Sequence, residues 1–264
     1  MSRIFCNGYE ATAEALAAAL TNYGHFTSMQ VRGSAVQGLD LHLQRLQQGT
    51  QALFSSGLDE AQLRGWLRAA LAACGVVDAS LRITVLSRQF DFRQPLSPVP
   101  VDVLVSVAAP VPPADRARAL CSVAYSREMP HLKHLGTFAL FQHRRQALQA
   151  GYDDAVFVDG DGHVSEGTTW NLALWDGRRV HWPQAPALRG TTEQLLMDGL
   201  ASQGGAQTRS EVALAALDQF SGAIACNSAG IWPISRIDRQ PFPDSASLLA
   251  MLRPLLDTRP WQPL

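Results

Sequence analysis

Apolar residues follow either a strand period or a helix period through most of the chain. A period of two, bounded by turn residues, predicts strands, whereas a period near 3.6 predicts amphipathic helices. The predicted strands span residues 25–31, 81–87, 101–107, 155–158, 171–175 and 223–228. The predicted helices span residues 9–21, 39–54, 59–74 and 136–150, and another opens within 188–196. Helices and strands therefore mix along the whole chain, which predicts an α/β (α+β mixed) fold.

A proline-rich segment divides the pattern into two parts. The sequence Ala108-Ala109-Pro110-Val111-Pro112-Pro113 fixes extended backbone and removes hydrogen-bond donors, as linkers often do. We therefore predict a small N-terminal α/β domain over residues 1–109, a linker over 110–116 and a large C-terminal domain over 117–264.

The composition is that of an ordinary globular protein. Hydrophobic residues make up 47%, charged residues 17%, and the net charge is −1, so no basic excess indicates a nucleic-acid or membrane partner. No apolar run approaches the roughly 20 residues of a membrane span, and the first residues lack a signal-peptide pattern. The four cysteines are widely separated, so we expect free thiols, no metal site and a cytoplasmic location.

Lys133 is the only lysine among the 22 lysine and arginine residues. Arginine stays protonated, whereas a desolvated lysine can lose its proton and attack a carbonyl carbon. A chain that uses arginine for nearly every cation therefore has one residue suited to Schiff-base chemistry. The alternative is that this lysine lies on the surface by chance.

The residues after Lys133 favour the chemical interpretation. A predicted helix ends at Gly151, with Arg144 and Arg145 available for its outer side. A hairpin with the turn Asp159-Gly160-Asp161-Gly162 then leads to Glu166. A glutamate placed after such a strand can accept a hydrogen bond from a buried cationic ring.

The segment from Lys133 through Glu166 to Asn171 resembles the pyridoxal 5′-phosphate (PLP) enzymes of fold type IV. These are the class IV aminotransferases, for branched-chain or D-amino acids, and the aminodeoxychorismate lyases. Ala173 departs from the aromatic residue that is common after the asparagine. The resemblance implies a two-domain fold like that of D-amino acid aminotransferase, with PLP held as a Schiff base on Lys133 and its ring nitrogen on Glu166.

Two further motifs resemble the residues that bind the PLP phosphate in the same family. The sequence His42-Leu43-Gln44-Arg45-Leu46 is similar to the family motif whose arginine binds the PLP phosphate, and an arginine fork suits that ligand. Taken alone, Arg45 would be a solvated charge on a helix. The turn Gly190-Thr191-Thr192 opens a predicted helix, where free N–H groups bind anions. The resemblance implies PLP contacts from Thr191, Thr192, Asn171 and Asn227.

Three residues are candidates for contact with substrate. In the family, the strand over 25–31 faces the cofactor, which makes Thr27 a candidate, and the loop over 88–95 often binds a carboxylate in the neighbouring subunit. Arg88 and Arg93 lie in this loop with Phe90 and Phe92. Arginines and aromatic residues are frequent in interfaces, so we predict a symmetric homodimer. If the loop stayed free, both phenylalanines would be exposed to water.

We first expect a PLP-dependent aminotransferase that acts on an amino acid. The alternative within the family is a 4-amino-4-deoxychorismate lyase, which releases pyruvate and 4-aminobenzoate from an amino-chorismate, because Cys226-Asn227 resembles the lyase form. A catalytically inert PLP-binding protein is a third possibility, because the helical pattern over 9–21 replaces the N-terminal strand hairpin that the family usually has. A Schiff-base aldolase without PLP would need neither Glu166 nor a phosphate site.

Overall fold

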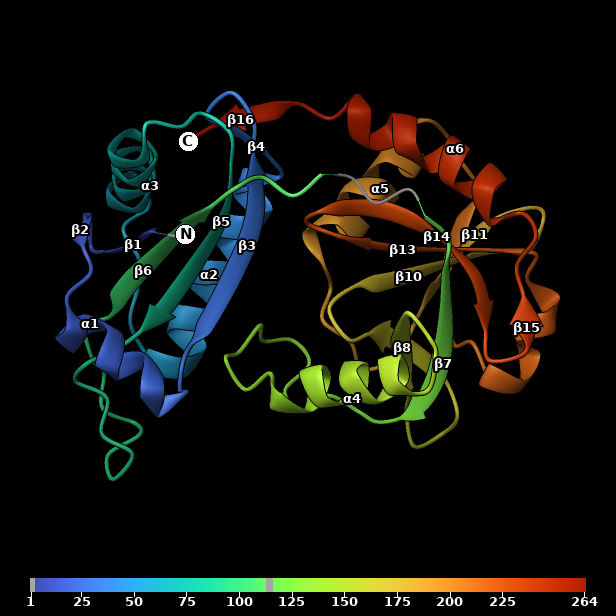
Figure 1. Cartoon of the computed structure of the whole chain (residues 1–264), viewed down its shortest axis with the longest axis horizontal. Coiled ribbons are helices and arrows are strands. Elements are labelled where there is room, and N and C mark those ends of the chain that lie inside the picture. Colours follow the sequence, from blue (N-terminus) through green and yellow to red (C-terminus); the bar gives the residue numbers. More distant parts are fainter. Residues whose placement is uncertain (1–2, 113–115) are drawn as a thin grey trace. The chain divides into compact units, whose positions relative to one another are not determined.

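A computed structural model describes residues 3–112 and 116–264 of the chain (Figure 1). The chain forms two compact units: the first consists of Met1–Val111, Leu132–Gly136 and Pro260–Leu264, and the second of Pro112–His131 and Thr137–Arg259. The main division lies inside the predicted linker, of which residues 113–115 are outside the described residues. Two short segments of the predicted C-terminal domain, by contrast, belong to the first unit.

The first unit is built on a five-stranded antiparallel sheet. Its strands, in spatial order, are β2 (Tyr9–Glu10), β1 (Arg3–Cys6), β6 (Asp102–Ala108), β5 (Ala79–Leu86) and β3 (His25–Val31). Successive side chains of a strand point to opposite faces. In β3, the buried Thr27, Met29 and Val31 therefore share one face, while Phe26 and Ser28 share the other.

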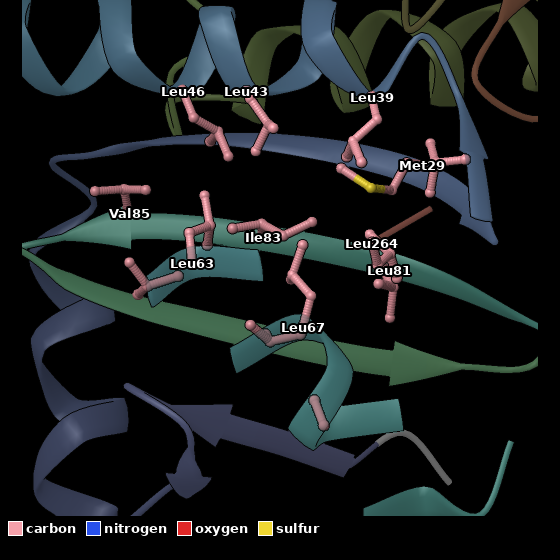
Figure 2. Close-up of a cluster of buried hydrophobic side chains, with 14 of the residues drawn as sticks. Met29, Leu39, Leu43, Leu46, Leu63, Leu67, Leu81, Ile83, Val85 and Leu264 are labelled. Atoms are coloured by element: carbon pink, nitrogen blue, oxygen red, sulfur yellow. The ribbon is translucent and has the colours of Figure 1, made fainter. Parts of the chain in front are cut away.

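Two helices of the first unit supply leucines to its core. They are α2 (Leu39–Phe54) and α3 (Glu60–Cys74), as the helical period predicts. Figure 2 shows their leucines converging with the side chains of β3 and β5. The side chain of Asp59 accepts a 2.9 Å hydrogen bond from Gln62 N, and Gly75 ends α3 in a left-handed conformation. The helix boundaries therefore follow from local capping.

The prediction that the N-terminus lacks a strand hairpin is wrong. β1 and β2 pair with each other around Asn7 and Gly8, whose φ angles are 50° and 88°. An Asn-Gly pair accepts positive φ at both positions and so forms a tight hairpin turn. The alanine-rich helix is present but begins only after this hairpin, as α1 (Ala13–Ala17) followed by the 3₁₀ turn η1 (Ala18–Thr21).

The last residues of the sequence also belong to the first unit. β16 (Trp261–Pro263) pairs antiparallel with β4 (Ala35–Gln37). Leu264 is buried in the core, and Arg68 Nη1 donates a 2.8 Å hydrogen bond to its carbonyl oxygen. This strand pair joins segments more than 200 residues apart, so no local pattern predicts it.

The second unit is built on a nine-stranded sheet of mixed direction. Its strands, in spatial order, are β12 (Gln207–Ser210), β11 (Val180–Pro183), β10 (Asn171–Trp175), β13 (Gly222–Asn227), β14 (Gly230–Ile237), β7 (Arg118–Ala124), β8 (Asp154–Val158) and β9 (Val164–Gly167), with β15 (Gln240–Pro241) paired to β14. Its helical elements are α4 (Phe138–Gln149), α5 (Thr191–Ser202), α6 (Ser245–Asp257) and the 3₁₀ turn η2 (Leu214–Gln219). The pairs β7–β8, β7–β14 and β11–β12 are parallel, and the remaining pairs are antiparallel. This arrangement confirms the predicted mixed α/β class.

No helix in the described ranges is both long enough and apolar enough to span a bilayer.

Candidate active site

Lys133 lies in the short segment Leu132–Gly136, which belongs to the first unit. The segment runs beside β3: Phe26 N donates to Lys133 O at 2.9 Å, and Leu135 N donates to Gly24 O at 2.9 Å. Lys133 is half-buried, and its Nζ lies 5.0 Å from the centroid of the Phe26 ring. Two backbone hydrogen bonds therefore fix the lysine next to the strand that the sequence predicted to face a cofactor.

Arg45 is held against the same strand by a chain of hydrogen bonds. Its Nη2 donates to Thr27 Oγ1 and lies 3.2 Å from His42 Nδ1, while Thr27 Oγ1 lies 2.7 Å from the same ring nitrogen. Because a guanidinium only donates, the Thr27 hydroxyl accepts from Arg45 and its own proton is directed to His42 Nδ1. His42 is then the neutral tautomer that carries its proton on Nε2.

The surroundings of His42 agree with this neutral form. Burial, supported by the positive charges of Arg45 and Lys133, holds the pKa of His42 well below its ordinary value. Lys133 and Arg45 both belong to the first unit, and the positive charge of each acts on the His42 ring. Thr27 is fully buried, and its hydroxyl is hydrogen-bonded to both Arg45 and His42.

Arg82 is a residue near this site that the sequence interpretation missed. Its Cζ lies 3.6 Å from the centroid of Phe26, so the ring is flanked by two cations, Arg82 and Lys133. Burial lowers the pKa of Arg82 from its ordinary value. A single charge inside the apolar run Leu81-Arg82-Ile83 was the available signal, because a half-buried strand rarely carries an arginine without a partner.

Glu166 lies in β9 of the second unit and is 4% exposed. β9 pairs with β8 around the predicted turn, where Asp159 N donates to His163 O at 2.9 Å. After Glu166 the chain has no room for a side chain at Gly167, because a Cβ there would lie 1.9 Å from the Trp170 ring. The hairpin and this tight packing fix the position of the carboxylate.

A buried carboxylate, Asp154, holds the loop between Glu166 and Asn171. Asp154 Oδ1 accepts from Thr168 Oγ1 at 2.7 Å, and Asp154 Oδ2 accepts from Trp170 Nε1 at 3.1 Å and lies 3.3 Å from Arg144 Nη1. The prediction that Arg144 is available for the outer side of its helix is therefore wrong. Its guanidinium turns inward because the fully buried charge of Asp154 requires a partner.

The N-terminus of α5 forms the second candidate phosphate site. The Oγ1 of Thr191 is buried and has no hydrogen-bond partner among the described residues. Thr192 Oγ1 donates to Asn227 O at 2.7 Å, and Asn171 Nδ2 donates to Leu188 O at 2.6 Å. A Cβ at Gly190 would lie 2.2 Å from Asn171 Oδ1. The structure thus gathers Asn171, Thr191, Thr192 and Asn227 around one helix end, where backbone N–H groups attract anions.

Asn227 also acts within its own turn. Its Nδ2 donates to Thr169 O at 3.2 Å, and its Oδ1 accepts from Ala229 N at 2.8 Å. The amide therefore connects the end of β13 to the loop that follows Glu166.

The loop over 88–95 differs in part from its prediction. Arg88 forms two hydrogen bonds with the Asp102 carboxylate, at 3.0 and 2.9 Å, and Phe90 stacks on Tyr23 with a centroid distance of 4.1 Å. Phe90 is therefore covered within the chain itself and does not need a second subunit to shield it from water. Phe92 is 70% exposed, and Arg93 has an exposed side chain. Both predicted arginines are exposed, but the Arg88 guanidinium is paired with Asp102, and the Arg93 side chain is the more exposed of the two.

Each unit carries its own set of candidate functional groups. The first unit supplies an amine, Lys133, beside the cation Arg45 and a neutral histidine. The second supplies a buried carboxylate, Glu166, and a helix end with an unsatisfied hydroxyl, Thr191. An amine that can attack a carbonyl carbon, two anion-binding groups and a buried carboxylate are the functions that a phosphorylated, carbonyl-bearing cofactor with a basic ring nitrogen requires.

Comparison with solved structures shows the same fold elsewhere. A branched-chain amino acid aminotransferase from T.th., complexed with N-(5′-phosphopyridoxyl)-L-glutamate, is 18% identical with a TM-score of 0.84, over 98% of this chain and 95% of the other. A hypothetical aminotransferase from Mycobacterium tuberculosis in its PLP-bound form is 20% identical with a TM-score of 0.80, over 97% of each chain. A protein from Legionella pneumophila proposed to be a 4-amino-4-deoxychorismate lyase is 17% identical with a TM-score of 0.78, over 89% of this chain and 92% of the other.

The sequence itself identifies the family. The profile of the amino-transferase class IV family matches residues 24–237, which include Lys133, Arg45, Glu166 and both threonines of the α5 turn. The predicted resemblance to fold type IV enzymes is thereby confirmed. The chain is an enzyme that belongs to the amino-transferase class IV family.

Proposed function

We propose that the protein is a PLP-dependent aminotransferase that removes the amino group of an amino acid, with Lys133 as its catalytic residue. The observation that carries this proposal is the position of Lys133. The only lysine of the chain is half-buried and fixed by the backbone of β3, in the unit that also holds Arg45. A lysine retained by chance on the surface would need no such placement.

The residues present fit PLP. The buried, unsatisfied hydroxyl of Thr191 and the N–H groups of the α5 end suit phosphate oxygens, as does the fork of Arg45. The buried carboxylate of Glu166 suits the pyridine nitrogen. When bound, PLP supplies an electron sink that stabilises negative charge on the substrate α-carbon. An aldolase that uses Lys133 without PLP would leave Glu166 and the α5 end without a purpose.

Each residue then has a defined task. Lys133 holds the cofactor through its Nζ and, when released, moves a proton to and from the α-carbon of the substrate. Glu166 keeps the ring nitrogen protonated. Arg45 and the N–H group of Thr191 hold the phosphate, whereas Asn171, Thr192 and Asn227 act through the turns that they connect.

The test is to identify the residue that PLP modifies. The purified protein is expected to be yellow, and borohydride reduction followed by peptide mapping should locate the cofactor on Lys133. Lys133→Ala should fold but show no such attachment. Label found only on the N-terminal amine would refute the proposal.

A lyase remains the second candidate, because Cys226-Asn227 has the lyase form and the Legionella protein shares the fold. Single amino acids should convert the absorbance of an aminotransferase to that of the pyridoxamine form. Release of pyruvate from 4-amino-4-deoxychorismate, without that conversion, would instead favour the lyase. The inert alternative loses its support, since the N-terminal hairpin is present.

We also expect a cytoplasmic homodimer. The four cysteines are free, as expected in a reducing compartment. The exposed Phe92 and Arg93 are the loop residues available for an isologous interface.

A further inference from the structure

Glu166 and Arg127 are two buried groups of opposite charge in the second unit. Glu166 is 4% exposed and Arg127 is 7% exposed. A charge removed from water is costly unless an opposite charge or hydrogen bonds compensate it. The burial of each therefore requires a partner of the other sign.

The other buried carboxylates in the described parts of the chain follow one rule. Each of them lies within 4 Å of an arginine nitrogen: Asp102 beside Arg88, Asp154 beside Arg144, and Glu193 beside Arg189. Glu166 is the remaining buried acid. By the same rule its charge should be paired with an arginine. Among the described residues of this unit, Arg127 is the arginine that is buried.

The fold brings the chain segments that carry the two residues side by side. The chain leaving β7 follows the end of β8, with Tyr125 N donating to Val158 O at 3.0 Å, and Val158 pairs with Val164, two residues before Glu166 on the same face of β9. The rings of Tyr125, His143 and Phe157 form a cluster at these segments, with centroids 4.7–5.6 Å apart.

The electrostatics of the cluster agree with this placement. Burial lowers the pKa of Arg127, and the charges of Glu166 and Tyr125 oppose that shift. Glu128 follows Arg127 directly, but it is exposed to solvent and so needs no buried partner.

We propose that Arg127 is a positioning residue whose guanidinium keeps the Glu166 carboxylate ionised and fixed in place. This inference rests on the proposed function for the role of Glu166 itself. A neutral or displaced carboxyl group could not hold a ring nitrogen protonated, so Arg127 would act on the reaction through Glu166 without touching the substrate.

The test is a double-mutant cycle on the full-length protein, with and without added PLP. Urea unfolding is measured for the parent, Arg127→Met, Glu166→Gln and the double variant. Each single variant leaves one buried charge unpaired, whereas the double variant leaves none. The two single effects, added together, predict a folding equilibrium constant for the double variant. The measured constant should exceed that prediction about tenfold or more.

Two comparisons make the cycle specific. Arg145 lies on α4 of the same unit and is exposed, so Arg145→Met should be additive with Glu166→Gln. Arg127→Lys keeps the charge and should recover part of the stability lost in Arg127→Met. If Arg127→Met does not fold, Glu166→Gln should restore folding in the double variant.

Additive effects of Arg127→Met and Glu166→Gln would overturn the inference, and so would a double variant that fails to fold while Glu166→Gln folds. The cycle without PLP does not depend on where the cofactor attaches. Its outcome is therefore distinct from failure of the proposed function, which the mapping of Lys133 decides.

Discussion

Thr27 Oγ1 lies 2.7 Å from His42 Nδ1, and the same hydroxyl accepts a hydrogen bond from Arg45. One fully buried hydroxyl thus connects a neutral histidine with the arginine that we expect to bind phosphate. The neighbouring Ser28 points to the opposite face of β3. Two adjacent hydroxyls of one strand therefore have different roles, which the sequence by itself could not separate.

Thr27→Val should lower the free energy of unfolding by about 1–3 kcal/mol, because it removes the hydrogen bond that Thr27 donates to His42 Nδ1 and leaves one Arg45 N–H without its acceptor. PLP affinity should fall as Arg45 loses its support. Urea unfolding and a PLP titration measure both effects. Thr27→Ser keeps the hydroxyl and should retain both properties, and Ser28→Ala should change stability by less than about 0.5 kcal/mol. Equal effects of Thr27→Val and Ser28→Ala would contradict the assignment.

Arg45→Ala should weaken PLP binding about ten- to a hundredfold, which corresponds to the roughly 1.5–3 kcal/mol of a charge-assisted hydrogen bond. Turnover at saturating PLP should change less, because the phosphate is bound equally in the ground state and the transition state. Equilibrium titration followed by absorbance measures the affinity. Arg239 is exposed in the second unit, so Arg239→Ala serves as the control for loss of a cation. Unchanged PLP affinity in Arg45→Ala would place the arginine outside the phosphate site.

His25 should make the protein less stable as the pH falls from 6.5 to 4. Burial, with a contribution from Arg45, lowers the pKa of His25 to about 4, and its Nε2 lies 3.0 Å from Thr50 Oγ1. Between these pH values the unfolded chain binds a proton that the folded chain does not, so stability rises with pH through this window. The contribution of His25 is about 3 kcal/mol over the whole window.

Urea unfolding of the parent and of His25→Gln across this window checks the effect. The variant starts from a lower stability, because the His25 ring packs against Gly49, where a Cβ would lie 2.6 Å from it. The comparison is therefore between slopes. The slope of His25→Gln should be shallower than that of the parent, whereas exposed His131→Gln should keep the parental slope. Parallel slopes for the parent and His25→Gln would show that the folded and unfolded chains bind the His25 proton alike, so that folding does not lower its pKa.

Arg93 should act across the subunit interface of the proposed homodimer. Mixing inactive Lys133→Ala subunits with Arg93→Ala subunits, under conditions that allow exchange, produces dimers in which one site carries neither lesion. Part of the activity should then return. An activity assay measures this recovery, and light scattering measures the oligomeric state of the same sample. Full activity of Arg93→Ala alone, or a monomer in solution, would contradict this role.

The sequence by itself determined the local elements and the chemistry of the main residues. The helix over 39–54 and the strand over 25–31 have the predicted boundaries, because period and turn residues act within a few positions. The presence of a single lysine, and its spacing to Glu166, already indicated the family that the profile confirms. The N-terminal hairpin was also within reach, because Asn7-Gly8 is a local turn signal that the alanine-rich stretch after it obscured.

Only the tertiary structure decided which distant segments meet. The Lys133 segment joins β3 of the first unit through hydrogen bonds to Gly24 and Phe26, and β16 reaches back to β4. The inward turn of Arg144 toward Asp154 likewise depends on which faces become buried. Strand pairing and charge burial are set by contacts between residues far apart in the chain, and a periodic pattern carries no information about such contacts.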